Sequence, residues 1–282
     1  MNLCYLIGYP VGHSMSAVMH NAAFRELGLD FRYKLRSVKP EALGHFVSSI
    51  MRRPDVRGAS VTIPHKVSVM AHLDEVDVVA RRIGAVNTIV NEDGWLKGYN
   101  TDSTGALRSL EDAFGDLRGA KVVILGAGGA ARAISYQLAA LVEELVILNR
   151  TLERAENLAN SLIEFPECRS EVSAHSLTSE SLERSLERAD IVINATSVGM
   201  KPNTDASPID SGLLRPDLLV LDIVYNPPMT KLLREAEAAG ASTLTGIGML
   251  VYQGAAAFKL WTGRNAPVET MMRSVEEALG VG

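Results

Sequence analysis

Cysteine is scarce in this chain of 282 residues, which contains only Cys4 and Cys168. Two thiols this far apart suit neither a disulfide framework nor a zinc site, and the six histidines also lack ligand spacing. We therefore expect no metal site and a reducing compartment, the cytoplasm. Long apolar runs and a signal-peptide pattern are also lacking, so the sequence predicts no membrane segment.

Positive charge is in short supply as well. The chain has 28 Lys and Arg residues against 33 Asp and Glu residues, a formal net charge of −5. This balance disfavours a nucleic-acid-binding protein but leaves room for a local basic cluster. With 47% hydrophobic and 22% charged residues, the composition is that of a folded globular protein, and the length suggests about two domains.

Short apolar runs alternate with helical patterns along the chain, which predicts an α/β fold with largely parallel sheets. In the first half we expect strands at 3–8, 31–38 and 56–63, helices at 16–27 and 40–53, and two helical stretches within 66–83. Asp93-Gly94 predicts a hairpin that joins strands at 85–91 and 95–99.

The second half has the spacing of a Rossmann-type, doubly wound parallel sheet. A helix is expected at 104–114, followed by strands at 121–125, 145–148, 191–194, 218–222 and 242–245. The C-terminal stretch is helical and has no strand of its own. We therefore predict a discontinuous α/β domain made of 1–103 and 248–282, and a nucleotide-binding domain at 104–247.

A glycine-rich loop follows the predicted strand 121–125. Gly126 allows a tight turn, Gly128 lets backbone amides approach a pyrophosphate, and Ala131 stands where the third glycine of the pattern would be. The N-terminus of the next helix offers unpaired N–H groups to an anion. A glycine pattern between a strand and a helix predicts a dinucleotide site.

The end of the next strand indicates which dinucleotide binds. An NAD site would place an acidic residue there, whereas this chain has Arg150, 24 residues after Gly126, and Arg154 four residues later. Two guanidinium groups and the hydroxyl of Thr151 suit a 2′-phosphate. The pattern favours NADP(H), although two solvated arginines on a helix would give the same sequence.

Polar side chains follow several strands of the first half, at the edge where ligands of open α/β sheets bind. Ser14 and Ser16 precede a helix, Lys66 follows Thr62, and further on come Asn87 and the run Asn100-Thr101-Asp102. Each residue alone reads as a helix cap or a surface group. Their joint placement at strand ends predicts a small-molecule site.

These segments together resemble the shikimate dehydrogenase family, nearly end to end and in the family's order. The matching stretches are Gly8–Ser16, Val61–Lys66, Gly84–Thr88, Asn100–Gly105, Gly126–Arg132, Asn149–Thr151, Asn194–Met200, Asp222–Pro227 and Gly248–Gly254. The resemblance implies the reversible NADPH-dependent reduction of 3-dehydroshikimate to shikimate, a step of the chorismate pathway to aromatic amino acids.

The resemblance also implies a role for individual residues. Lys66 and Asp102 would be the catalytic pair, and the residues that bind substrate would be Ser14, Ser16, Thr62, Lys66, Asn87, Asp102, Tyr225 and Gln253. Of these, the two serines and the Tyr225 hydroxyl would bind the substrate carboxylate. The cofactor would be held by Gly126, Ala127, Gly128, Gly129, Ala130, Asn149, Arg150, Thr151, Arg154, Thr196, Met200 and Gly246. Of these, Thr196 and Met200 would line the nicotinamide side.

Two positions depart from the family pattern, because Ala17 stands where proline is usual and Ser60 where asparagine is frequent. Two other interpretations stay open at this stage. One is a quinate or quinate/shikimate dehydrogenase that uses NAD, and the other is a non-catalytic NADP-binding regulator with the same fold. The sequence leaves the oligomeric state open, a homodimer included.

Overall fold

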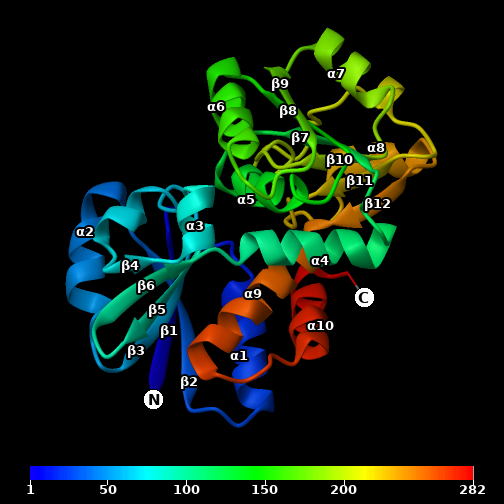
Figure 1. The fold of residues 1–282 in the computed structure, drawn as a ribbon. Helices are drawn as coiled ribbons and strands as arrows, with labels where there is room; N and C mark the ends of the chain where they lie inside the picture. Colours follow the sequence, from blue (N-terminus) through cyan, green and yellow to red (C-terminus); the bar gives the residue numbers. More distant parts are fainter. Residues whose placement is uncertain (282) are drawn as a thin grey trace. The chain divides into compact units, whose positions relative to one another are not determined.

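The computed structural model describes residues 1–281. The chain folds as two compact units: unit 1 consists of Met1–Gly105 and the segment from Leu250 onward, and unit 2 of Ala106–Met249. We describe each unit by itself (Figure 1). The roles predicted for the two domains, substrate binding and NADP binding, stay predictions at this point.

Unit 1 contains a six-stranded sheet in the order β2-β1-β3-β5-β6-β4. Its strands are β1 (Asn2–Gly8), β2 (Phe31–Ser37), β3 (Val56–Val61), β4 (Glu75–Val76), β5 (Thr88–Glu92) and β6 (Trp95–Tyr99). β1 is parallel to β2 and β3, but β5 is antiparallel to both β3 and β6. β4 is parallel to β6, so three of the five pairings are parallel and the sheet is mixed, with both antiparallel pairings at β5.

The hairpin between β5 and β6 forms as predicted. Both turn residues have positive φ, 52° at Asp93 and 97° at Gly94, which is the backbone that an Asp-Gly hairpin turn uses. This tight reversal, in place of a helical crossover, makes β6 antiparallel to β5.

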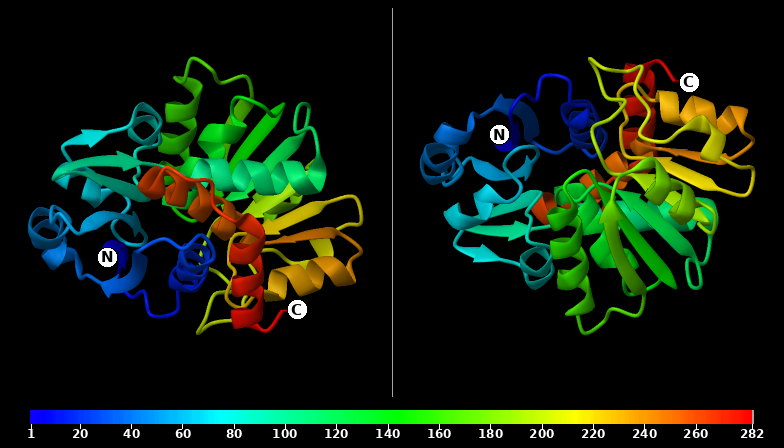
Figure 2. Two further views of the ribbon diagram at one scale, coloured as in Figure 1. Left: turned by 90° about the horizontal axis from the view of Figure 1, so that it is seen from below. Right: turned by 90° about the horizontal axis from the view of Figure 1, so that it is seen from above.

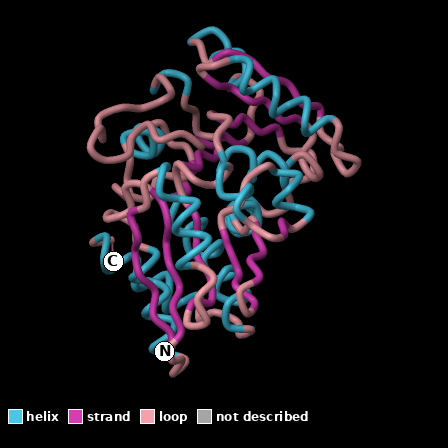
Figure 3. The backbone as a smooth tube through the Cα atoms, turned by 90° about the vertical axis from the view of Figure 1, so that its left-hand side faces the viewer, coloured by secondary structure: helices cyan, strands magenta, loops and turns pink. Residues whose placement is uncertain are grey.

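The helices of unit 1 are α1 (Ser16–Glu26), α2 (Leu43–His45), α3 (Val78–Ile83), α10 (Val268–Leu279) and most of α9 (Gly246–Thr262). The helix expected at 40–53 is wrong as a regular helix: a 3-10 turn at Pro40–Ala42 leads into α2 and then a π-helical turn at Phe46–Ile50. Within 66–83 only α3 is α-helical, since Ser68–His72 is a 3-10 turn and β4 follows it. Figure 3 traces these short helices beside the strands.

Apolar side chains cover both faces of the β1–β3 part of this sheet. On one face Tyr5 and Ile7 pack with Val47 and Met51 from the irregular helical segment. The other face carries Tyr33, whose ring lies 5.9 Å from that of Trp261 in α9. The C-terminal helices thus complete the core of unit 1, which explains why this unit is discontinuous.

Unit 2 contains a six-stranded sheet in the order β12-β11-β10-β7-β8-β9, in which every pairing is parallel. Its strands are β7 (Lys121–Leu125), β8 (Glu144–Asn149), β9 (Glu171–Ser176), β10 (Ile191–Asn194), β11 (Leu219–Asp222) and β12 (Ser242–Thr245). This is the strand order of a Rossmann fold, and the strand order reverses between β7 and β10. The predicted doubly wound fold is confirmed.

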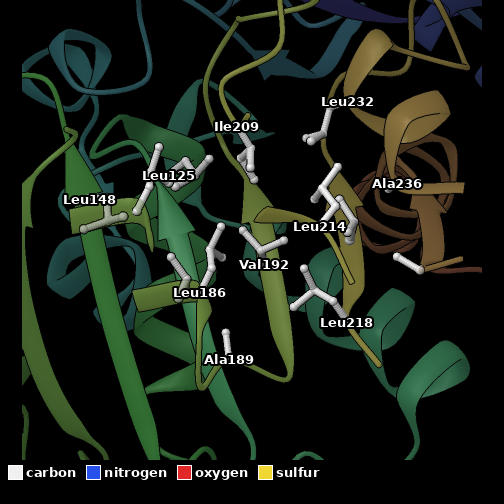
Figure 4. Close-up of a cluster of buried hydrophobic side chains, with 14 of the residues drawn as sticks. Leu125, Leu148, Leu186, Ala189, Val192, Ile209, Leu214, Leu218, Leu232 and Ala236 are labelled. Atoms are coloured by element: carbon white, nitrogen blue, oxygen red, sulfur yellow. The ribbon is translucent and has the colours of Figure 1, made fainter. Parts of the chain in front are cut away.

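Helices cover both faces of the unit 2 sheet, as Figure 2 shows from two sides. They are α4 (Asp102–Phe114, which begins in unit 1), α5 (Gly129–Leu138), α6 (Leu152–Ile163), α7 (Ser179–Leu186) and α8 (Lys231–Ala238), with a 3-10 turn at Ser211–Leu213. On the α7 and α8 side, Leu125, Leu148 and Val192 of the strands pack with Leu186 and Leu232 (Figure 4). Burial on both faces is why these strands are continuous apolar runs in the sequence.

The strand β9 was not expected from the sequence. It lies at the edge of the sheet, and its residues are half-buried or exposed, so its sequence Glu-Val-Ser-Ala-His-Ser lacks an apolar run. None of the helices within residues 1–281 has both the length and the apolarity that a membrane span requires.

Candidate active site

Lys66 and Asp102 form an ion pair in unit 1. Lys66 lies on the loop after β3, and Asp102 is the first residue of α4 (Figure 1). The Lys66 Nζ atom donates to Asp102 Oδ2 at 2.5 Å, and the two side chains are only 16% and 7% exposed. Because Lys66 is partly accessible and its ammonium is held by one carboxylate oxygen, it can also donate to a ligand.

Asn87 holds the other oxygen of that carboxylate. Its Nδ2 donates to Asp102 Oδ1 at 2.8 Å and to Thr101 Oγ1 at 3.0 Å, and lies 3.4 Å from Gln253 Oε1. Its Oδ1 accepts from the backbone N–H of Thr101 at 2.7 Å. Asn87 and Asp102 are buried, so the carboxylate is fixed by neutral donors as well as by Lys66.

Gln253 enters the same network from α9, 166 residues along the chain from Asn87. Its Nε2 donates to the Leu250 carbonyl at 2.7 Å, which directs Oε1 toward Asn87. The structure thus brings four of the predicted residues, Lys66, Asn87, Asp102 and Gln253, into one hydrogen-bonded group.

Ser14 and Ser16 lie together at the start of α1. Their Oγ atoms are 3.1 Å apart, and Ser14 Oγ also accepts from the Ser16 backbone N–H at 3.2 Å. Met15 is the residue before the helix, and its side chain makes no capping hydrogen bond to the described residues of α1. Two hydroxyl groups beside a helix N-terminus form a suitable environment for a carboxylate.

Thr62 is positioned by a close contact between two strand ends. A Cβ atom added at Gly8 would lie 2.4 Å from Thr62 Cγ2 and 2.9 Å from the Ile63 carbonyl oxygen. Only glycine therefore allows the segment after β1, which carries the serines, to lie against the segment after β3, which carries Lys66.

The departure at Ser60 leaves its buried hydroxyl without a hydrogen-bond partner among the described residues.

The glycine-rich loop of unit 2 has the backbone that a dinucleotide site needs. Gly126 follows β7 with φ of +112°, and a Cβ there would lie 3.0 Å from the Ala195 carbonyl oxygen. Gly128 is exposed and precedes α5, with open space where its Cβ would be. This space lets a pyrophosphate reach the first N–H groups of α5, so the loop fits the predicted cofactor.

The basic cluster lies after β8, at the N-terminus of α6. The side chains of Arg150, Thr151 and Arg154 are exposed, and within the described chain the two arginines have no ion-pair partner. Asn149 Nδ2 donates to the Thr151 carbonyl at 2.8 Å and shapes the turn. Cations at a helix N-terminus oppose the helix dipole, so a bound phosphate would relieve an unfavourable arrangement.

The remaining predicted cofactor residues lie elsewhere in unit 2. Thr196 donates from Oγ1 to Asn194 Oδ1 at 2.7 Å, and Met200 is half-buried on the same loop. A Cβ at Gly246 would lie 2.4 Å from the Ile223 carbonyl oxygen, so packing alone requires glycine there. Tyr225, which is predicted to bind the substrate carboxylate, lies on the loop after β11. The ligand-binding roles of these four residues stay predictions.

A buried carboxylate was missed as a candidate. Asp222, at the end of β11, is completely buried, and burial raises its pKa to about 6 although Thr230, Val224 and Asn194 donate hydrogen bonds to it. In the sequence, Asp222 stands out only as the first residue of the family-like stretch Asp222–Pro227. The signal that could have found it is an acidic residue directly after the apolar run 218–221.

Comparisons with known proteins agree with this geometry. Residues 6–89 match the family model for the shikimate dehydrogenase substrate binding domain, residues 108–228 match that for shikimate/quinate 5-dehydrogenase, and residues 246–276 match that for the shikimate 5′-dehydrogenase C-terminal domain. The chain is also 51% identical to the shikimate dehydrogenase (NADP(+)) of Methanopyrus kandleri, over 99% of this chain and 96% of that protein. The chain belongs to the shikimate dehydrogenase family.

Solved structures support the same family. The shikimate 5-dehydrogenase of Thermus thermophilus, in complex with NADP(H) and shikimate, superposes with a TM-score of 0.88 and 38% identity, covering 99% of this chain and all of that one. A quinate dehydrogenase of Corynebacterium glutamicum in complex with NAD gives the same TM-score at 30% identity, covering 98% of this chain and 99% of that one. The resemblance stated from the sequence is confirmed.

Proposed function

We propose that this protein is a shikimate dehydrogenase that reduces 3-dehydroshikimate to shikimate with NADPH, reversibly. The observation that carries this proposal is the Lys66–Asp102 ion pair inside a buried network of hydrogen-bonded side chains. Bound NADPH would supply the hydride that adds to the substrate carbonyl carbon. Side chains of the protein would bind the substrate and transfer the proton.

Lys66 is the residue that we expect to donate a hydrogen bond to the carbonyl oxygen of the substrate. An ammonium group within hydrogen-bond reach of that oxygen stabilises the negative charge that develops as the carbonyl is reduced, and then donates the proton. Asp102 accepts one hydrogen bond from Lys66 and one from Asn87, so it orients the ammonium. In the oxidation direction, Lys66 receives the proton from the substrate hydroxyl.

The other polar side chains of unit 1 would bind the rest of the substrate. Thr62, Asn87 and Gln253 are assigned to the ring hydroxyls. The side-chain amides of Asn87 and Gln253 are already held by hydrogen bonds. A substrate hydroxyl would therefore bind to amide groups whose directions are fixed in advance. Ser14 and Ser16 are assigned to the substrate carboxylate, together with Tyr225.

The cofactor assignment rests on the basic cluster of unit 2. Arg150, Thr151 and Arg154 would hold the 2′-phosphate, with Asn149 shaping their turn, and the glycine-rich loop would hold the pyrophosphate. An acidic residue at position 150 would have favoured NAD instead. The two arginines therefore favour NADP over NAD, and they disfavour an NAD-linked quinate dehydrogenase.

An absorbance assay at the nicotinamide band tests the function. The purified chain is assayed with shikimate and with quinate, each with NADP and with NAD. We expect kcat/KM to be highest for shikimate with NADP. A higher kcat/KM for quinate with NAD would show that the protein is a quinate dehydrogenase. Measurable NADPH binding without any turnover would show that it is a non-catalytic regulator.

Two further assignments are part of the proposal. We propose that the protein acts in the cytoplasm, where its substrate and reduced cofactor would be available.

A homodimer is the assembly that we propose to test first, by light scattering of the purified chain across a tenfold range of concentration. A mass of one chain at every concentration would overturn it.

A further inference from the structure

Asp222 is a buried acid that has no cationic partner among residues 1–281. The side chain is 0% exposed, and the three groups that donate to it are neutral: Thr230 Oγ1 at 2.7 Å, Asn194 Nδ2 at 2.9 Å and the Val224 backbone N–H at 3.0 Å. A buried carboxylate is costly to keep without a counter-charge. Its retention at the end of β11 therefore calls for a role that a hydrophobic side chain could not fill.

One arm of the network leads to the loop after β10. Asn194 is also fully buried, and its Nδ2 must face Asp222, since the carboxylate can only accept. Its Oδ1 consequently faces the loop, where it accepts from the Thr196 backbone N–H at 3.1 Å and from Thr196 Oγ1 at 2.7 Å. Thr196 Oγ1 in turn accepts from the Val198 N–H at 3.1 Å. Asn194 Nδ2 also donates to the Val198 carbonyl at 3.2 Å, so the amide that bonds to Asp222 is joined through both of its polar atoms to the loop that carries Thr196 and Met200.

The other arm leads to the loop after β11. Thr230 donates to Asp222 and accepts from the Leu233 N–H at 3.3 Å, which caps α8. Val224 is bonded directly, so both ends of the 224–230 segment are tied to the same carboxylate. The Lys201 N–H also donates to the Asn226 carbonyl at 3.4 Å, which links the two loops to each other.

We propose that Asp222 is a positioning residue for hydride transfer, a single buried carboxylate that holds the loops 195–200 and 223–230 in one arrangement. The inference rests on the proposed function, because it concerns how the cofactor-side loop is held during that reaction. Asp222 is too deeply buried to touch a ligand. It acts through Asn194, which fixes Thr196, and the Thr230 arm serves mainly to anchor α8.

Four variants separate these arms. Asn194→Ala removes the link to Thr196, and Asp222→Ala removes the centre of the network. Thr230→Val removes only the helix-cap arm. Asp222→Asn is the conservative replacement: its remaining oxygen still accepts from Asn194 and Val224, and the Thr230 hydroxyl can rotate to accept from the new amide.

Steady-state kinetics with shikimate and NADP is combined with the Kd for NADPH from fluorescence and with thermal unfolding. We expect Asn194→Ala to lower kcat by about 10-fold to 100-fold, because a misplacement near 1 Å at the reacting centre has such an effect. The Kd for NADPH should change less than 3-fold, since the phosphate-binding groups are elsewhere. Asp222→Asn should keep kcat within about 3-fold of the wild type, and Thr230→Val should lower the unfolding temperature with kcat within the same range.

The double variant Asp222→Ala/Asn194→Ala shows whether both residues act along one path. We expect its kcat to equal that of Asn194→Ala within about 3-fold, because the second change breaks a link already broken. A purely structural role predicts lower unfolding temperatures with unchanged kcat per folded molecule. That result, or a loss of kcat in Thr230→Val as large as in Asn194→Ala, would overturn the inference. If Asp222→Ala does not fold, the comparison of Asn194→Ala with Thr230→Val still decides it.

The wild-type assay distinguishes a failure of the proposed function from a failure of the inference about Asp222. No turnover by the wild-type chain overturns the proposed function and this inference with it. Turnover by the wild type with unchanged kcat in Asn194→Ala overturns the inference alone.

Discussion

Both units gather polar groups beside the ends of sheet strands, but the kinds of group differ. In unit 1 the groups are buried side chains already bonded to one another, with Lys66 and Asp102 at the centre. In unit 2 they are backbone N–H groups next to glycines and exposed arginines. A pre-bonded network fixes directions for chemistry, whereas open amides and exposed cations suit a flexible phosphate. Changes to the network of unit 1 should therefore affect kcat, and changes to the glycine-rich loop or the basic cluster of unit 2 should affect the affinity and choice of cofactor.

The largest effect is expected from Lys66→Ala, which removes the proposed proton donor. General acid catalysis and charge stabilisation act through this one ammonium, so kcat should fall by about 10³-fold or more. The Kd for NADPH, measured by fluorescence, should stay within about 3-fold. Lys97→Ala is the matched control, because Lys97 is also paired with an acidic residue of unit 1, Glu75, but lies outside the network. Unchanged turnover in Lys66→Ala would remove Lys66 from the mechanism.

Arg150→Asp tests the cofactor-binding half of the comparison. The change removes the charged donor that we propose for the 2′-phosphate, worth about 1.5–3 kcal/mol, and adds a repelling carboxylate. The ratio of kcat/KM for NADPH to that for NADH should fall by about 10-fold to 100-fold.

Arg184→Asp is the control for Arg150→Asp, since it makes the same charge change on the exposed side of α7 in the same unit. Its cofactor ratio should equal that of the wild type. An unchanged ratio in Arg150→Asp would show that the basic cluster does not select the cofactor.

Gly126→Ala tests whether the shape of the glycine loop matters for binding. A non-glycine residue at φ of +112° is strained by about 1–3 kcal/mol, and its Cβ would lie 3.0 Å from the Ala195 carbonyl oxygen. The KM for NADPH should rise about 10-fold. Gly115→Ala is the control, because Gly115 also has positive φ, +86°, but has open space and lies outside the loop. Equal rises in KM for both variants would contradict a specific role for the loop.

The smallest effect is on stability, and it concerns a part of unit 1 away from the proposed chemistry. His20 is completely buried against the ring of Tyr33, 4.5 Å away, and burial lowers the pKa of its imidazole to about 3. Neither ring nitrogen has a hydrogen-bond partner within the described residues. The unfolded chain takes up a proton near pH 6.5 and the folded chain does not, so stability is complete above pH 6.5 and falls as the pH drops toward 3.

From these values, His20 removes about 2 kcal/mol of the free energy of unfolding between pH 7 and pH 5. His20→Phe should abolish that loss while keeping the aromatic packing. Urea unfolding at both pH values, followed by the fluorescence of Trp95 and Trp261, reports on unit 1 alone, which contains both tryptophans. His45→Phe, at an exposed position of the same unit, should leave the pH dependence as it is. Equal pH dependence in wild type and His20→Phe would refute this account.

The sequence by itself determined the features that depend on local pattern. Apolar runs buried on both faces predicted the strands of unit 2, Asp93-Gly94 predicted the hairpin, and the loop beginning at Gly126 predicted the dinucleotide site. The ordered motifs were specific enough to identify the family. These signals are strong because a turn, a buried strand or a phosphate loop each restricts the residues within a few positions of one another.

The tertiary structure decided what depends on partners far along the chain. The antiparallel pairing of β3 with β5, the edge strand β9 and the irregular segment after Pro40 follow from neighbours that no local pattern specifies. The same holds for the contact of Asn87 with Gln253 and for the burial of His20 and Asp222. A side chain's charge and hydrogen bonds depend on which distant groups surround it, and only folding brings those groups together.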